Sequence, residues 1–297
     1  MIKIKTILKK NKAISALFTP VVIISIVIFS LILLSSLFAP IVSSYDPEKV
    51  DLSIALEKPS QNHLLGTDSM GRDQFTRLLY GARTTLTNAF LVVLISIVVG
   101  IPLGLICGYY GGWIDTLIMR VWDCILAFPA LLLAFILVAA FGRGSYNAVL
   151  AIGIVYIPMI SKLARTLAMT EKTKAYVEAS KTFGYSGARI IFLHILPNCV
   201  STLLAELTLD IGYAITALAS LSFLGLGVQL PKSDWGSMLQ QGFGVLFNRP
   251  VLALAPGISI ILCVVSLNVL SDGIQMYLDP DQRKLPSFKK YREREVA

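Results

Sequence analysis

The chain has 297 residues, of which 55% are hydrophobic and only 15% are charged, and its mean hydropathy is +0.73. This composition is too apolar for an ordinary soluble protein. The formal net charge is +8. Because the basic residues are divided among the flanks of apolar runs and do not form one patch, the charge argues against nucleic-acid binding and for a membrane topology signal.

Six apolar stretches are long enough to cross a bilayer, which takes roughly 20 mostly apolar residues. Backbone groups in lipid must hydrogen-bond within their own segment, so each stretch should be a helix. The sequence therefore predicts an all-α membrane protein with six transmembrane helices, an N-terminal anchoring helix followed by a five-helix core. The predicted spans are 14–40, 85–108, 116–141, 146–168, 199–224 and 251–275.

Most Lys and Arg residues fall in segments that are cytoplasmic if the N-terminus lies inside. This distribution predicts a multi-pass protein of the cell membrane with both termini in the cytoplasm. The first apolar run is longer than the apolar region of a signal peptide, and no convincing cleavage site follows it. We expect it to be an uncleaved first span.

Four regions follow from this topology. Residues 1–40 hold a basic N-terminus and the first span, and residues 41–82 form an external segment too small for a core of its own. Residues 83–275 form the core, which includes a cytoplasmic loop at 169–198, and residues 276–297 form a basic cytoplasmic tail.

Glycines recur at four-residue spacing in the second predicted span, so one face of that helix lacks side chains and a neighbouring backbone can approach closely. Packing within the chain and packing against another subunit both fit this pattern. Pro102 on the same helix predicts a kink. The glycines are Gly100, Gly104, Gly108 and Gly112.

A polar island at residues 176–198 separates the fourth and fifth predicted spans and cannot lie in hydrocarbon. Thr170 is expected to cap a helix that begins at Glu171, and Gly184 stands where a left-handed C-terminal residue is needed. Ser186 is expected to cap a second helix. The island is thus either a helix–turn–helix along the cytoplasmic membrane surface or a solvated connector.

Within this island, Glu178-Ala179-Ser180, then Gly184 and the closing Leu196-Pro197, resemble the EAA loop of ABC-importer permeases. The resemblance implies that the short helix of the loop docks into a groove on an ATPase subunit and transmits its closure to the spans.

Three further motifs resemble the peptide/nickel branch of these permeases, and together with the loop they run in the family's order over nearly the whole chain. The external motif is His63 to Asp73 with Gly66, Thr67, Asp68, Gly71 and Arg72, continuing to Arg83; the others are Leu221 to Gln229 with Trp235-Gly236, and Asn268 to Pro280. The chain is therefore identified as a member of this family, resembling its C-type permease subunit.

The resemblance implies a non-catalytic subunit that forms half of a translocation pathway. Its expected partners are a homologous permease, two ABC ATPase subunits, an extracytoplasmic substrate-binding protein and membrane lipid. The chain contains no G-x-x-x-x-G-K-[ST] phosphate loop, so ATP and Mg²⁺ should be used by the ATPase subunits, and this chain should bind no cofactor.

The substrate stays open between nickel or another metal chelate and a dipeptide or oligopeptide. Leu218 replaces an acidic residue that many relatives have, and the run Leu209 to Gly212 resembles nickel permeases more than dipeptide permeases.

In the external motif, Gly66 and Gly71 permit turns, and Arg72 is able to pair with Asp68 or Asp73. The motif is either a local structural cluster or a contact for the substrate-delivering protein. His63 lacks a second ligand at useful spacing and is not predicted to hold a metal.

Ionisable residues within spans are costly and are functional candidates by default. Glu206 and Asp210 are four residues apart, so they share a helix face and should point into the bundle. They either line the pathway or lock helix packing. Asp115, Asp123 and Asp272 are expected first as interfacial or helix-packing groups.

Two other classes of function fit less well. A secondary transporter or channel not driven by ATP would be expected to show inverted repeats or broken helices, and neither is clear in the sequence. An intramembrane enzyme would need a nucleophile–base pair or a metal triad, and none is visible. The cysteines, predicted to pack as small hydrophobic residues, are Cys107, Cys124, Cys199 and Cys263.

Overall fold

The structure is a computed structural model that describes residues 19–278. The basic residues predicted before the first span and most of the predicted tail lie outside the described residues. Within 19–278 every regular element is a helix, and the only β-type pairing is an isolated bridge between Thr67 and Asp73. The helices are α2 (Pro20–Leu37), α3 (Ala39–Val42), η1 (Leu52–Ile54), α4 (Gln74–Tyr110), α5 (Gly112–Leu126), α6 (Ala130–Phe141), α7 (Ser145–Glu171), α8 (Ala175–Thr182), α9 (Gly187–Ile190), η2 (Ile191–Ile195), α10 (Leu196–Phe223), α11 (Trp235–Phe243) and α12 (Val251–Leu278).

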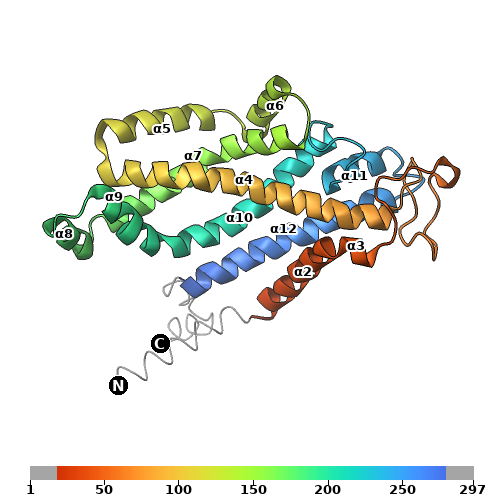
Figure 1. Ribbon diagram of the computed structural model, residues 1–297, viewed down its shortest axis with the longest axis horizontal. Coiled ribbons are helices and arrows are strands. Elements are labelled where there is room, and N and C mark those ends of the chain that lie inside the picture. The colour runs from red at the N-terminus through yellow and green to blue at the C-terminus, as the bar shows by residue number, and fades with distance from the viewer. Residues whose placement is uncertain (1–18, 279–297) are drawn as a thin grey trace, which may run out of the picture.

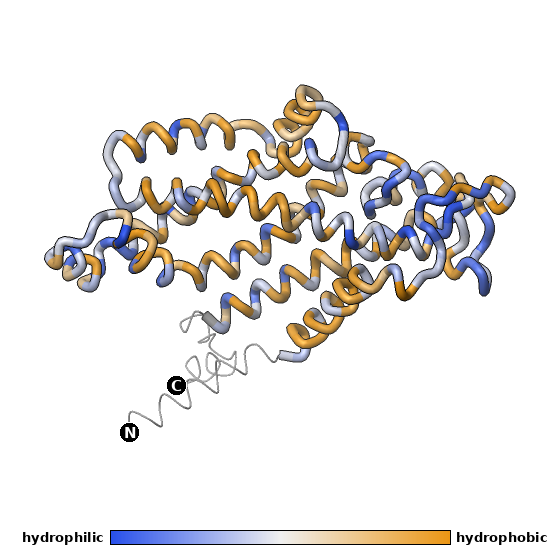
Figure 2. The backbone as a smooth tube through the Cα atoms, in the orientation of Figure 1, coloured by the Kyte–Doolittle hydropathy of each residue, from blue (hydrophilic) through white to orange (hydrophobic). Residues whose placement is uncertain are grey.

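The long helices α4, α7, α10 and α12 run side by side, and α2 packs against α12 and α4 (Figure 1). At one end of the bundle, here called the α8 end, lie α8, α9 and the last turns of α4. At the other end, here called the loop end, lie residues 43–73, the connection 224–234 and α11. Apolar residues dominate between the two ends, while polar residues gather at both (Figure 2). This banding is that of a membrane-spanning bundle.

Among the described residues, five helices are long and apolar enough to cross a membrane, and α5 with α6 makes a sixth only if the bent pair counts as one span. The predicted third span, 116–141, is therefore wrong as a continuous helix, because α5 and α6 meet at 90°. The break falls at Phe128-Pro129. Proline has no backbone N–H and its ring clashes with the preceding turn, so α5 ends before it and α6 starts after it.

The pair α4 and α7 forms the centre of the bundle, and glycines make it possible. Gly100, Gly104 and Gly108 of α4 lie against the backbone carbonyls of Ile157, Ser161 and Arg165 in α7, and a Cβ built on Gly100 would stand 2.9 Å from the Ile157 oxygen. The glycine face thus packs within this chain. Its predicted fourth member is wrong: Gly112 lies beyond the end of α4, has φ +64° and faces open space.

Two ion pairs fasten α5 to α7. Arg165 donates two hydrogen bonds to the carboxylate of Asp115, at 2.5 and 2.6 Å, and Lys162 donates to Asp123 at 2.7 Å. Both acids are thus helix-packing groups, as predicted. The four cysteines are free. Cys107, Cys199 and Cys263 are buried, as predicted for small packing residues, whereas Cys124 is exposed on α5, so the prediction is wrong for Cys124.

We predict that Gly104→Ala destabilises the protein, because the new methyl group would overlap the Ser161 carbonyl and push α4 from α7. Overpacking of this kind costs roughly 1–3 kcal/mol. The matched control is Gly257→Ala in α12, where the added Cβ would lie 3.6 Å from Leu239 and alanine favours the helix. Thermal unfolding of the purified variants measures both effects, and equal midpoints would contradict the packing account.

Candidate functional site

The predicted helix–turn–helix is present at the α8 end. Gly184 has φ +77°, and Tyr185 N–H donates to the Ser180 carbonyl across the turn at 3.2 Å. Ser186 caps α9 by accepting from Arg189 N–H. Leu196 and Pro197 open α10, where proline is tolerated because the first helical N–H groups have no intrahelical partner.

The predicted start of this unit at Glu171 is wrong. Helix α7 continues to Glu171, and the Thr170 hydroxyl donates to the Thr166 carbonyl inside that helix and caps nothing. Helix α8 begins only after Lys174, whose backbone is extended. The cause is the apolar face of α7, which keeps Ala164 and Ala168 buried and so prolongs the span.

One face of α8 is fastened to the bundle. Glu171 accepts from Lys174 at 2.5 Å and from the Tyr176 hydroxyl at 2.6 Å. Val177 is fully buried, and the buried Ser180 hydroxyl donates to the Tyr176 carbonyl. Burial and the bond to Glu171 raise the pKa of Tyr176 well above its usual range, so this phenol keeps its proton at neutral pH.

The opposite face of α8 is exposed on the surface. Glu178 and Ala179 are exposed, and Phe183 at the turn is 77% exposed. Of the residues predicted for this site, Glu178, Ala179 and Gly184 thus lie on the surface. Ser180 is buried and bonds within α8. The outer face of α8 and the Phe183 turn therefore lie on the surface of the α8 end.

The external motif forms a buried polar network at the loop end. Asp68 accepts from Arg72 Nε at 2.7 Å and lies 3.4 Å from Arg77 Nε. Asp73 caps α4 through Thr76 N–H at 2.7 Å and pairs with His63 Nδ1 at 2.9 Å. Each carboxylate thus has its own partners: Arg72 pairs with Asp68 and not with Asp73.

The two glycines of this motif have a structural reason. Gly66 and Gly71 have φ of +75° and +74°, and each lies against a backbone carbonyl, of Glu57 and Asp51 respectively. Thr67 is fully buried. Since no side chain fits at the two glycines, the motif folds as one compact unit onto the start of α4.

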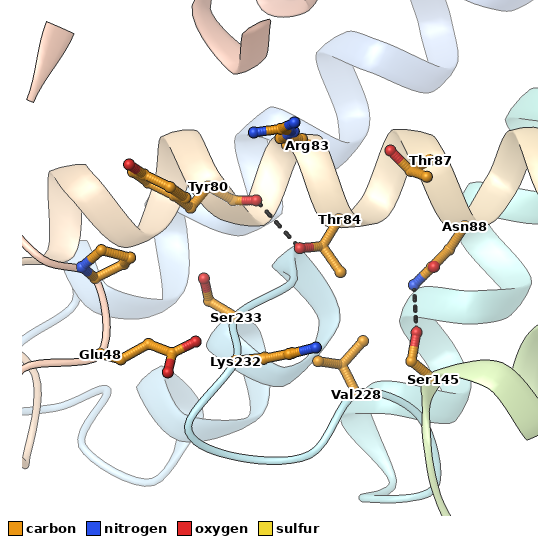
Figure 3. Close-up of a pocket in the computed structure, with 11 residues that line it drawn as sticks. Glu48, Tyr80, Arg83, Thr84, Thr87, Asn88, Ser145, Val228, Lys232 and Ser233 are labelled. Atoms are coloured by element: carbon orange, nitrogen blue, oxygen red, sulfur yellow. Dashed lines mark hydrogen bonds between the residues drawn. The ribbon is translucent and has the colours of Figure 1, made fainter. Parts of the chain in front are cut away.

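A polar cavity of about 390 Å³ opens beside this network (Figure 3). Its helical wall is the first part of α4, with Tyr80, Arg83, Thr84, Thr87 and Asn88. The facing wall comes from residues 47–48, Ser145 and the connection 228–233. Sequence reasoning missed this site; the spacing of Tyr80, Thr84 and Asn88 marks one polar helix face, but nothing in the sequence brings the other walls to it.

The pathway candidates lie on α10 as predicted. Asp210 is 4% exposed and faces the bundle, while Glu206 is half-buried. Asp210 Oδ2 and Asn268 Oδ1 are buried without a hydrogen-bond partner among the described residues. A helix-packing role would be expected to satisfy the Asp210 carboxylate with hydrogen bonds, whereas a pathway-lining role would not. Both predicted roles stay open.

Comparison with known proteins now places the chain. Residues 100–284 match the family described as binding-protein-dependent transport system inner membrane component. The chain is 41% identical to the dipeptide transport system permease protein DppC of Alkalihalophilus pseudofirmus, over 93% of this chain and 88% of that protein. It is 40% identical to the glutathione transport system permease protein GsiD of Pectobacterium atrosepticum, over 85% of each. The chain therefore belongs to this family: it is a permease subunit of an ABC importer and not an enzyme.

The fold has a solved counterpart. A chain of the MetNI methionine ABC transporter in inward-facing conformations superposes with a TM-score of 0.54 at 18% identity, over 69% of this chain and 96% of that one. At this identity the likeness concerns the fold alone.

We predict that Asp68→Asn destabilises the loop end, because it leaves Arg72 and Arg77 buried without their carboxylate. Breaking one side of a buried ion pair costs ~3–5 kcal/mol. Limited proteolysis of residues 43–73 and thermal unfolding measure the loss. The control is Glu57→Gln, an exposed acid of the same segment, and an unchanged Asp68→Asn protein would disprove the network's structural role.

Proposed function

We propose that this permease forms half of a translocation pathway for short peptides and is driven by two ABC ATPase subunits that engage α8. A homologous permease supplies the other half, and an extracytoplasmic binding protein delivers the substrate. The names of the relatives favour dipeptides and glutathione as the substrate class. Nickel or a metal chelate, the other substrate class that the sequence left open, finds no support in those names.

The observation that carries the coupling role is the two-sided character of α8. Its inner face is bonded to the end of α7, and its outer face ends in the exposed Phe183 turn. Displacement of α8 by a closing ATPase would therefore move α7, and with it α4, which the glycine face holds against α7. ATP and Mg²⁺ belong to the ATPase subunits.

The orientation that this role requires agrees with the basic residues of the α8 end. Lys162 and Arg165 lie in the second half of α7, Lys172 and Lys174 lie between α7 and α8, and Arg189 lies in α9. The basic residues of the N-terminal segment and of the tail add to these, and the positive-inside rule then favours an arrangement in which this end and both termini face the cytoplasm and the loop end faces outward toward the binding protein.

We predict that Ala179→Trp uncouples transport from ATP hydrolysis. Ala179 is exposed, so the larger side chain leaves the fold intact but prevents α8 from entering a groove. A steric clash that costs about 1.4 kcal/mol or more lowers binding roughly tenfold or more. ATP-driven uptake and co-purification of the ATPase subunits are measured together. Ala55→Trp, at an exposed alanine of the loop end, is the control, and unchanged uptake in Ala179→Trp would refute the docking assignment.

We further predict that Glu206→Gln with Asp210→Asn lowers uptake without changing assembly, because Asp210 is buried with its Oδ2 lacking a hydrogen-bond partner among the described residues, and Glu206 shares its face. Both replacements are nearly isosteric, so packing is retained. Asp272→Asn, an exposed acid on α12, serves as control. Intact uptake in the double variant would assign the two acids to helix packing.

A further inference from the structure

The cavity of Figure 3 contains charges that the protein itself leaves unused. Glu48, Arg83 and Lys232 line it, and in the described part of the chain none of their side chains forms a hydrogen bond or an ion pair. Elsewhere at the loop end the buried carboxylates of Asp68 and Asp73 are paired. Glu48 acts at longer range on the buried charge of Arg77, but with no hydrogen bond or ion pair in the described part of the chain this acid and the two bases are available to a ligand.

Glu48 and Lys232 lie on two different loops, and one buried residue, Arg77, bonds both loops. Arg77 is 1% exposed, and its Nη1 donates to the carbonyl of Pro47 at 3.1 Å and to the carbonyl of Pro231 at 3.3 Å. Those carbonyls immediately precede Glu48 and Lys232. The acid and the base are therefore fixed relative to each other by the network that contains Asp68, and such preorganisation favours binding.

The wall on α4 offers groups suited to a peptide bond. Within residues 19–278 the Thr87 hydroxyl has no hydrogen-bond partner. Asn88 uses its Nδ2 to donate to Ser145 at 2.9 Å, which leaves its carbonyl oxygen as an acceptor. Thr87 and Asn88 lie on adjacent faces of α4, and a hydroxyl donor together with an amide acceptor matches the C=O and N–H of an amide. Val228 adds an apolar surface. The volume of about 390 Å³ lies within the roughly 300–1,000 Å³ of small-molecule sites.

We propose that this cavity binds a short peptide with free termini, whose ammonium group pairs with Glu48 and whose carboxylate pairs with Lys232. The proposal rests on the proposed import of short peptides and adds the place where the permease itself first meets them. The pairing also discriminates between substrate classes. An anionic metal chelate would use Arg83 and Lys232 but would be repelled by Glu48.

The test uses the complete importer with its binding protein, reconstituted in vesicles that lack phosphatidylethanolamine, whose headgroup is also a zwitterion. Glu48→Gln and Lys232→Gln are compared with Glu57→Gln and Lys58→Gln, the same charge changes at exposed positions outside this cavity. Uptake of a free-ended dipeptide is measured at subsaturating concentration. Because ion pairs at such exposed positions are modest, each cavity variant should lower uptake about two- to fivefold, and the controls should not.

A second readout locates the ligand. A dipeptide with a diazirine side chain should label residues 80–88 or 228–233 on illumination. Excess free-ended dipeptide should prevent this labelling, whereas N-acetylated or amidated dipeptide should not. Glu48→Gln should lose the preference for the free amine, and a merely structural role of Glu48 would leave it unchanged.

Each remaining outcome decides between the proposals. If the unaltered importer takes up no peptide, the proposed function fails and the cavity proposal fails with it. If it does take up peptide but the cavity variants match their controls and no labelling occurs, only the cavity proposal fails. A defect seen only when phosphatidylethanolamine is restored assigns the cavity to lipid. Weaker binding of the empty binding protein by the variants assigns it to protein docking.

Discussion

The carboxylate of Asp68 lies between Arg72 and Arg77 at the start of α4, and the order of the loop end depends on it. Without that negative charge, two buried guanidinium groups would repel each other in a region of low polarity. With it, Arg72 reaches Gln241 of α11, while Arg77 holds the carbonyls of Pro47 and Pro231. Segments up to 194 residues apart in the sequence (47–241) are thereby fixed around one ion cluster.

Helix α4 joins this cluster to the opposite end of the bundle. It begins at the Asp73 cap, forms one wall of the cavity and then lies against α7 through three glycines. Helix α7 in turn ends at Glu171, which is bonded to α8. Two closely packed helices therefore link the cavity at the loop end to the Gly184 turn at the α8 end. Close backbone packing transmits displacement because interiors of this density do not deform continuously.

Motifs with a local physical cause were predictable from the sequence. Gly184 and Ser186 gave the turn and cap of the α8 end, since a left-handed residue and a hydroxyl before a helix act within a few positions. The same reasoning failed at Thr170, because burial of the α7 face outweighed a cap signal of about 1 kcal/mol. The prediction of one continuous span at residues 116–141 also failed. It followed the high hydropathy of the segment, whereas in the structure Pro129 separates α5 from α6.

The sequence by itself determined the membrane-spanning helices, the glycine face and the family, because hydropathy, residue spacing and short motifs are properties of neighbouring positions. Only the tertiary structure decided which carboxylate each arginine meets, that Ser180 points inward, and that a cavity exists at all. The walls of that cavity come from residues 47–48, 80–88, 145 and 228–233. No local pattern relates segments so distant in the chain, and they meet because Arg77 is long enough to bond two loops from one buried position.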